Sequence, residues 1–176
     1  MARSTELLKH VALLRGINVG GKNILPMKDL AGIFRDAGCA EVSTYIQSGN
    51  VLFMASAAAA TALPAKVARQ IESSFGYRIP VVLRTLPELK AAIAANPFID
   101  SEADEKALHV YFLQEMPAPE AVSALDPNRS HPDRFIVSGR EVYLHLPNGM
   151  ARTKLTNAWL DSKLKTVSTA RTGTQS

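Results

Sequence analysis

Short runs of strand-forming apolar residues alternate along this chain with stretches whose apolar residues recur every three or four positions. The recurring spacing places apolar side chains on one face of a helix, whereas the short runs indicate strands. In the first half we expect strands at 10–15, 42–47, 51–54 and 79–84. Two helices lie between them, with apolar faces formed by Met27, Leu30, Ile33, Phe34 and Ala37 and by Leu63, Val67, Ile71 and Phe75. The order is βαββαβ, the ferredoxin-like arrangement.

Local signals predict where these helices begin and end. Pro26 suits a first helical turn, and Gly38 and Gly76 suit the position after a last turn. The alanine-rich stretch Ala55–Ala62 is expected to lead into the second helix. A short helix over 87–95 follows the fourth strand and ends before Pro97, because the residue preceding a proline disfavours helical backbone.

The second half repeats this order. Strands are expected at 108–113, 134–137, 141–146 and 166–170, and a short helix lies near 119–125. A longer helix runs to Leu164, with the hydroxyl of Thr153 as its N-terminal cap. The apolar face of this helix contains Leu155, Ala158 and Trp159.

Sequence similarity between the halves indicates a duplication. Residues 45–50 read Tyr-Ile-Gln-Ser-Gly-Asn, residues 135–140 read Phe-Ile-Val-Ser-Gly-Arg, and each follows an apolar strand that begins with a histidine, His10 or His109. We therefore predict an α+β protein of two ferredoxin-like βαββαβ units. The units are expected to pack together, because two helices cover only one face of each sheet. The expected domains are residues 1–96 and 108–176, joined by an acidic linker over 97–107.

Composition indicates a globular protein without disulfides. A chain of 176 residues with 47% apolar residues can bury a core without metal or cross-links. The single cysteine, Cys39, excludes an internal disulfide and fits a reducing compartment. The start of the chain lacks the pattern of a signal peptide, and the uncharged span 42–65 is too polar for a membrane helix. We expect a soluble cytoplasmic protein that does not contact membranes.

Positive charge is concentrated in the first half. Residues 1–96 contain eleven Lys and Arg against six Asp and Glu, within a net charge of +4 for the chain. A basic half favours contact with phosphates or acidic surfaces, and ordinary surface solvation is the alternative. No histidine pair has metal-ligand spacing, and no Ser-His-Asp order or carboxylate pair emerges. We expect neither a metal nor a cofactor.

The first candidate site is the loop 15–23, Arg-Gly-Ile-Asn-Val-Gly-Gly-Lys-Asn, between a strand and a helix. Backbone amides in such loops often bind phosphate. The spacing matches most of a nucleotide-binding P-loop, but Asn23 replaces the magnesium-binding hydroxyl residue and Pro26 delays the helix. The alternative is a tight turn that glycine permits, with Lys22 in solvent. The candidate residues are Arg15, Asn18, Gly20, Gly21, Lys22 and Asn23.

The second candidate site is the tip of the first hairpin. Hydrogen-bonding side chains and one aromatic ring gather there: Tyr45, Gln47, Ser48 and Asn50. Together they offer polar groups and a stacking face to a ligand. In the alternative interpretation, Tyr45 packs between strands while Ser48 and Asn50 satisfy the backbone of the turn.

The third candidate site joins the second hairpin to its helix. Residues 147–157 read Pro-Asn-Gly-Met-Ala-Arg-Thr-Lys-Leu-Thr-Asn, and the candidate residues are Asn148, Arg152, Lys154 and Asn157. Arg152 and Lys154 lie near the start of a helix, whose positive end favours an anion. The alternative is capping by Thr153 with both basic side chains in solvent.

These motifs resemble a known family. Residues 10–53, above all Leu14–Asn23 and Tyr45–Asn50, resemble the family called domain of unknown function 1697 (DUF1697), and Pro147–Asn157 resembles its second signature. The resemblance implies a duplicated βαββαβ fold and no established activity. Family members usually continue with Arg-Asn-Trp-Asn-Thr and a terminal helix. Here Arg171 is followed by Thr-Gly-Thr-Gln-Ser, so the Asn-Trp pair and the helix are missing.

We predict that the protein binds a phosphate-bearing ligand, either a nucleotide or a nucleic acid, at its basic glycine-rich loops. Both loops and the first hairpin would line one cleft if the units pack suitably. One alternative is a small enzyme acting on a phosphorylated metabolite, for which no base is evident. Another is a protein-interaction module with an exposed sheet edge. The oligomeric state stays open. Charge would come from Arg15, Lys22, Arg152 and Lys154, and hydrogen bonds from Asn18, Asn50 and Asn157.

Overall fold

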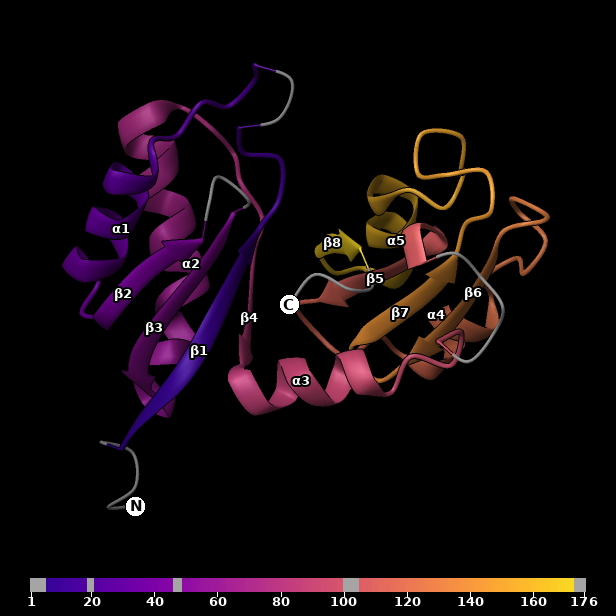
Figure 1. Ribbon diagram of the computed structural model, residues 1–176, viewed down its shortest axis with the longest axis horizontal. Helices are drawn as coiled ribbons and strands as arrows, with labels where there is room; N and C mark the ends of the chain where they lie inside the picture. Colours follow the sequence, from indigo (N-terminus) through magenta and orange to yellow (C-terminus); the bar gives the residue numbers. More distant parts are fainter. Residues whose placement is uncertain (1–5, 19–20, 46–48, 100–104, 173–176) are drawn as a thin grey trace. The chain divides into compact units, whose positions relative to one another are not determined.

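The protein consists of two units, each built on a four-stranded antiparallel sheet (Figure 1). A computed structural model describes residues 6–18, 21–45, 49–99 and 105–172. The chain divides into the compact units Met1–Leu89 and Lys90–Ser176, called unit 1 and unit 2 below. None of the helices among the described residues is both long and apolar enough to cross a membrane.

Unit 1 has the predicted βαββαβ order, and its sheet has the strand order β2-β3-β1-β4. Its elements are β1 (Leu7–Leu14), α1 (Met27–Asp36), β2 (Ala40–Tyr45), β3 (Asn50–Ser56), α2 (Ala57–Phe75) and β4 (Val81–Thr85). Helix α3 (Leu86–Ala94) follows directly and contains the division between the units.

Unit 2 repeats this order, with the sheet β6-β7-β5-β8. Its elements are the 3-10 helix η2 (Glu105–Ala107), β5 (Leu108–Leu113), α4 (Pro119–Ser123), β6 (Arg134–Ser138), β7 (Glu141–His145), α5 (Asn157–Leu164) and β8 (Ser168–Thr172). The predicted α+β class with a duplicated βαββαβ unit is confirmed. The packing of the units and the predicted domain limits stay predictions.

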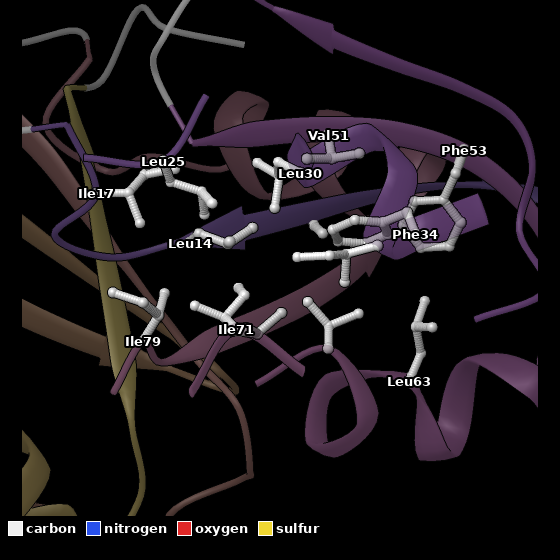
Figure 2. Close-up of a cluster of buried hydrophobic side chains, with 14 of the residues drawn as sticks. Leu14, Ile17, Leu25, Leu30, Phe34, Val51, Phe53, Leu63, Ile71 and Ile79 are labelled. Atoms are coloured by element: carbon white, nitrogen blue, oxygen red, sulfur yellow. The ribbon is translucent and has the colours of Figure 1, made fainter. Parts of the chain in front are cut away.

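The core of unit 1 forms where α1 and α2 cover one face of the sheet. Leu30 and Phe34 of α1 and Leu63, Val67 and Ile71 of α2 are at most 2% exposed, as the helical spacing predicted. Figure 2 shows Leu30, Phe34, Leu63 and Ile71 against Leu14, Val51 and Phe53 of the sheet. Each such side chain contributes about 1.5–3 kcal/mol when it leaves water. This burial holds the strand ends, and therefore the loops between them, in place.

The core of unit 2 is formed in the same way by the helix-facing side of its sheet. Tyr111, Val142 and Leu144 from the strands pack with Leu160 and Leu164 of α5. The Tyr111 side chain is fully buried, and its hydroxyl donates to the carbonyl of Leu155 at 2.7 Å. The connection before α5 is therefore tied to the sheet beneath it.

Two helix starts differ from the prediction. Helix α5 begins at Asn157, where the hydroxyl of Thr156 accepts from the amide of Trp159. Thr153 is not the cap, because its hydroxyl accepts from the amide of Leu155 within the preceding loop. Most of the alanine-rich stretch is also part of the second helix itself, since α2 starts at Ala57 with Ser56 as its cap, whereas Ala55 belongs to β3.

The two units place corresponding hydrogen bonds at the same end of their sheets. The amide of Leu14 donates to Gly49 and that of Arg15 to Pro80, while in unit 2 Leu113 donates to Arg140 and Gln114 to Val167. The inserted loops differ in position. Unit 1 has its long connection between β1 and α1, residues 15–26, whereas unit 2 has it between β7 and α5, residues 146–156. The two basic loops are therefore not equivalent in the repeat.

Candidate functional site

The loop between β1 and α1 is held closed by one of its own side chains. The Asn18 amide spans the backbone of Leu25, since its Nδ2 donates to the Leu25 carbonyl at 3.0 Å and its Oδ1 accepts from the Leu25 amide at 2.8 Å. Leu25 is fully buried. Asn18 was predicted to bind a ligand, and in the structure its side chain bridges the two ends of the loop.

Asn23 makes a second closure. Its Nδ2 donates to the Gly16 carbonyl at 2.9 Å, and its carbonyl accepts from the Asn18 amide. Asn18 and Asn23 both have left-handed backbone, with φ of 55° and 51°, a conformation that asparagine tolerates better than most residues. Gly21 has a left-handed backbone, with φ of 75°. A side chain at this position would contact no other atom, but its backbone conformation would be strained.

The closed loop presents Lys22 to solvent. Lys22 is exposed, and its side chain makes no hydrogen bond or ion pair among the described residues. Helix α1 begins five residues later, after Pro26, so Lys22 does not lie on its first turn. That turn has no side-chain cap, which leaves its first amides for solvent or a ligand. Gly20 lies outside the described residues.

The loop and the first hairpin meet at one end of the unit 1 sheet. The backbone bonds from Leu14 to Gly49 and from Arg15 to Pro80 join the loop, the hairpin and the start of β4. Asn50 is 8% exposed and pairs with Leu13 and Tyr45 across the sheet, so its backbone is part of the ladder. Arg15 is half-buried. Gln47, Ser48 and the side chain of Tyr45 lie outside the described residues.

The second basic loop lies at the end of the unit 2 sheet where β7 finishes. Asn148, Arg152 and Lys154 are exposed there, which fits both a ligand site and the alternative of basic side chains in solvent. Asn157 faces inward, because its Nδ2 donates to the hydroxyl of Ser168 at 2.8 Å, and that hydroxyl donates to the Asp161 carboxylate at 2.6 Å. Asn157 therefore links α5 to β8.

A turn over 126–133 supports this loop, which the sequence patterns did not indicate. The Ser130 hydroxyl accepts from the amide of Lys154 at 2.9 Å and donates to the Asp133 carboxylate at 2.7 Å. The Nε of Arg129 donates to the carbonyl of Lys154 at 3.0 Å. The backbone amide and the backbone carbonyl of Lys154 are thus both hydrogen-bonded to residues more than twenty positions away.

An aromatic platform adjoins the same loop. The guanidinium of Arg129 lies over the ring of Trp159, 4.6 Å from its centroid, and Phe135 meets this ring edge-on at 6.2 Å. Trp159 was predicted only as an apolar residue of its helix. Arg129 was not singled out, because the residues around it are typical of an ordinary turn. Tertiary contact alone brings the two side chains together.

Several ionisable groups lie in or near the cores of the two units. His10 stacks on Phe53, and its Nδ1 lies 2.9 Å from the carbonyl of Leu8. Burial lowers the pKa of His109, and its Nε2 has no partner among the described residues. The Cys39 thiol is half-buried, and burial raises its pKa. Within the described ranges no three His, Cys, Asp or Glu side chains are grouped as metal ligands.

Two surface hollows are lined by residues outside the three candidate sites. One of about 250 Å³ is lined in unit 1 by Ala68, Arg69, Glu72, Arg78, Ile79 and Pro80. The other, of about 560 Å³, is lined in unit 2 by Met116, Ala118, Glu120, Ala121, Lys163, Leu164 and Lys165. Neither contains a residue of the three candidate sites, so the basic loops are surface features, not the walls of these hollows.

Comparison with known proteins places the chain in a family. Residues 7–143 match the family described as protein of unknown function (DUF1697), so the chain belongs to that family. The matched residues include the first basic loop and the first hairpin and end before the loop 146–156. No match is found among curated proteins.

The fold also matches a solved structure. The conserved bacterial protein SP0830 from Streptococcus pneumoniae superposes with a TM-score of 0.66 at 20% identity. The match covers 94% of this chain and 92% of that one. At this identity the likeness concerns the fold alone.

Proposed function

We propose that this member of the DUF1697 family binds a phosphate-bearing ligand, a nucleotide or a nucleic acid, at its basic loops. The observation that carries the proposal is the closed loop of unit 1. The side-chain amides of Asn18 and Asn23 form hydrogen bonds with the backbone of the same loop, while Lys22 faces solvent. A loop fixed before binding loses little entropy when a ligand arrives. Such a loop displays charge at a defined place.

The charge balance of the loop favours an anion. Residues 15–29 contain Arg15, Lys22 and Lys28 against Asp29, a formal charge of +2. The uncapped first turn of α1 adds the partial positive charge of a helix N-terminus. Backbone amides and a lysine in this arrangement suit phosphate oxygens, which accept several hydrogen bonds at once.

The second loop has the same balance. Residues 148–157 contain Arg152 and Lys154 and no acidic residue. Both side chains are exposed, and the loop that carries them is held by Tyr111, Arg129 and Ser130. Each unit therefore offers one braced loop with a formal charge of +2.

Calorimetry with phosphate-bearing probes tests the proposal. Pyrophosphate, mononucleotides and a short single-stranded oligonucleotide are titrated into the protein and into Lys22→Ala. Loss of one charge-assisted contact should weaken binding at the unit 1 loop by about 1.5–3 kcal/mol. The melting temperature should stay nearly unchanged, because surface substitutions usually change stability by less than about 0.5 kcal/mol.

Lys66→Ala is the matched control. Lys66 is exposed on α2 of the same unit, so its loss changes the net charge equally but removes nothing from the loop. Equal weakening in both variants would mean that only overall charge matters. Absence of binding by every probe would refute the proposed function.

A further inference from the structure

We propose that the basic loop of unit 2 recognises a nucleobase that carries phosphate, with the base stacked on the guanidinium of Arg129. The inference rests on the proposed function and names the chemistry of its ligand at this loop. It concerns Arg129, Lys154 and Trp159, all of which lie within unit 2.

The platform consists of the Arg129 guanidinium and the Trp159 ring. The guanidinium carbon of Arg129 lies over the Trp159 ring, 4.6 Å from its centroid. Arg129 is an exposed residue, so its side chain is accessible to a ligand. Guanidinium planes stack on aromatic rings through cation–π contact, and they stack on nucleobases in the same way.

Two further contacts hold this platform in place. The Nε of Arg129 donates to the carbonyl of Lys154, and Phe135 packs edge-on against Trp159. An exposed arginine usually loses considerable freedom when it binds. Here the indole and the Lys154 carbonyl already hold the guanidinium, so stacking costs less entropy.

Two positively charged side chains belong to the loop beside this platform. The hydrogen bond from Arg129 to Lys154 places the platform beside the loop that carries Lys154 and Arg152, both exposed. A planar stacking surface next to positive charge is the combination by which proteins hold single strands without reading their sequence. The base would stack on Arg129 while the phosphates meet the two basic side chains.

The alternative reading of the Arg129–Trp159 pair is a structural contact that covers the indole. That reading explains the stacking, but it predicts no difference between ligands with and without bases. The comparison of such ligands therefore separates the two.

The test uses fluorescence anisotropy of labelled strands with the full chain. One strand is an oligothymidylate of about 12 nucleotides, and the other is an abasic strand of equal length, with the same phosphates and no bases. A mononucleotide competitor shows whether the source of the base is a free nucleotide or a strand. Base stacking contributes about fivefold or more to affinity, so the base-bearing strand should bind at least about fivefold tighter.

Two substitutions separate stacking from charge. Arg129→Lys retains the positive charge and removes the planar group, and Arg129→Ala removes both. We expect the preference for the base-bearing strand to disappear in both variants, while Arg129→Lys retains its affinity for the abasic strand. Within each variant, the affinity for the base-bearing strand is divided by the affinity for the abasic strand. A general loosening of the loop weakens both affinities equally and therefore leaves this ratio unchanged. Arg35→Ala, an exposed arginine on α1, is the control and should keep the ratio.

The outcomes distinguish failure of this inference from failure of the proposed function. Equal affinity for both strands overturns stacking and leaves phosphate binding intact. A preference that survives in both Arg129 variants overturns this site for the base. Absence of binding by both strands, by the mononucleotide and by pyrophosphate overturns the proposed function and this inference together. Trp159, the single tryptophan, gives an independent local signal, since its emission should change at the same strand concentration as the anisotropy.

Discussion

Replacing Asn18 by alanine should destabilise unit 1 strongly, although the residue lies in a surface loop. The amide bridges both backbone groups of Leu25, a residue with no exposed surface. Alanine removes the acceptor for the Leu25 amide and the donor for its carbonyl. It also has to adopt a φ of 55°, which costs an L-residue about 1–2 kcal/mol.

The magnitude follows from these parts. A buried amide left without its partner costs about 1–3 kcal/mol. Added to the backbone strain of alanine, the expected loss of unfolding free energy for Asn18→Ala is about 2–5 kcal/mol, partly offset by any water that enters. Asn18→Gly loses the same hydrogen bonds but tolerates the left-handed backbone. It should be about 1 kcal/mol more stable than the alanine variant.

Urea denaturation followed by far-ultraviolet circular dichroism measures both variants. Tryptophan emission is unsuitable, because the single tryptophan lies in unit 2 and Asn18 lies in unit 1. An Asn18→Ala protein within about 0.5 kcal/mol of the unmodified protein would refute the structural role of this side chain. A glycine variant no more stable than the alanine variant would show that backbone strain plays no part.

Three further outcomes follow. Thr156→Ala should lower the unfolding free energy by about 1 kcal/mol, because it removes the cap of α5, and a melting curve that does not move would contradict the cap. Burial raises the pKa of Cys39, so its alkylation by iodoacetamide near neutral pH should be slower than that of a free cysteine and should accelerate in urea; equal rates would contradict its burial. Burial lowers the pKa of His109 below its ordinary value of 6.5, so the folded state favours the neutral ring. That contribution to stability is present above about pH 6.5 and is lost as the pH falls through the folded-state pKa. His109→Leu should therefore lose less stability on acidification than the unmodified protein. Identical profiles of stability against pH would exclude His109 as a source of the pH dependence.

Much of the secondary structure could be predicted because its signals are local. The apolar stripe through Leu63, Val67 and Ile71 faces the core of α2, and Gly76 ends that helix in left-handed backbone. The strand 108–113 has the predicted limits. Errors arose where two residues offered the same signal. Thr153 and Thr156 both suit a cap, and only the fold of the preceding loop directs the Thr153 hydroxyl to Leu155.

The candidate sites could be predicted only in part. Lys22, Arg152 and Lys154 are exposed in loops, as glycine and charge indicated. The asparagines were harder to assign, because a side-chain amide serves a ligand or a nearby backbone equally well. Asn18 and Asn157 use their amides inside the protein, a choice that depends on which groups the fold places within about 3 Å.

The sequence by itself determined the order of elements and the duplication, since periodicity and turn residues act over a few positions and need no distant partner. Only the tertiary structure decided which side chains meet across larger separations. Arg129 reaches the carbonyl of Lys154 and the ring of Trp159 because α4, α5 and the strands between them bury their apolar faces together. Burial of that core fixes the ends of the elements, and the contacts between their loops follow from where those ends lie.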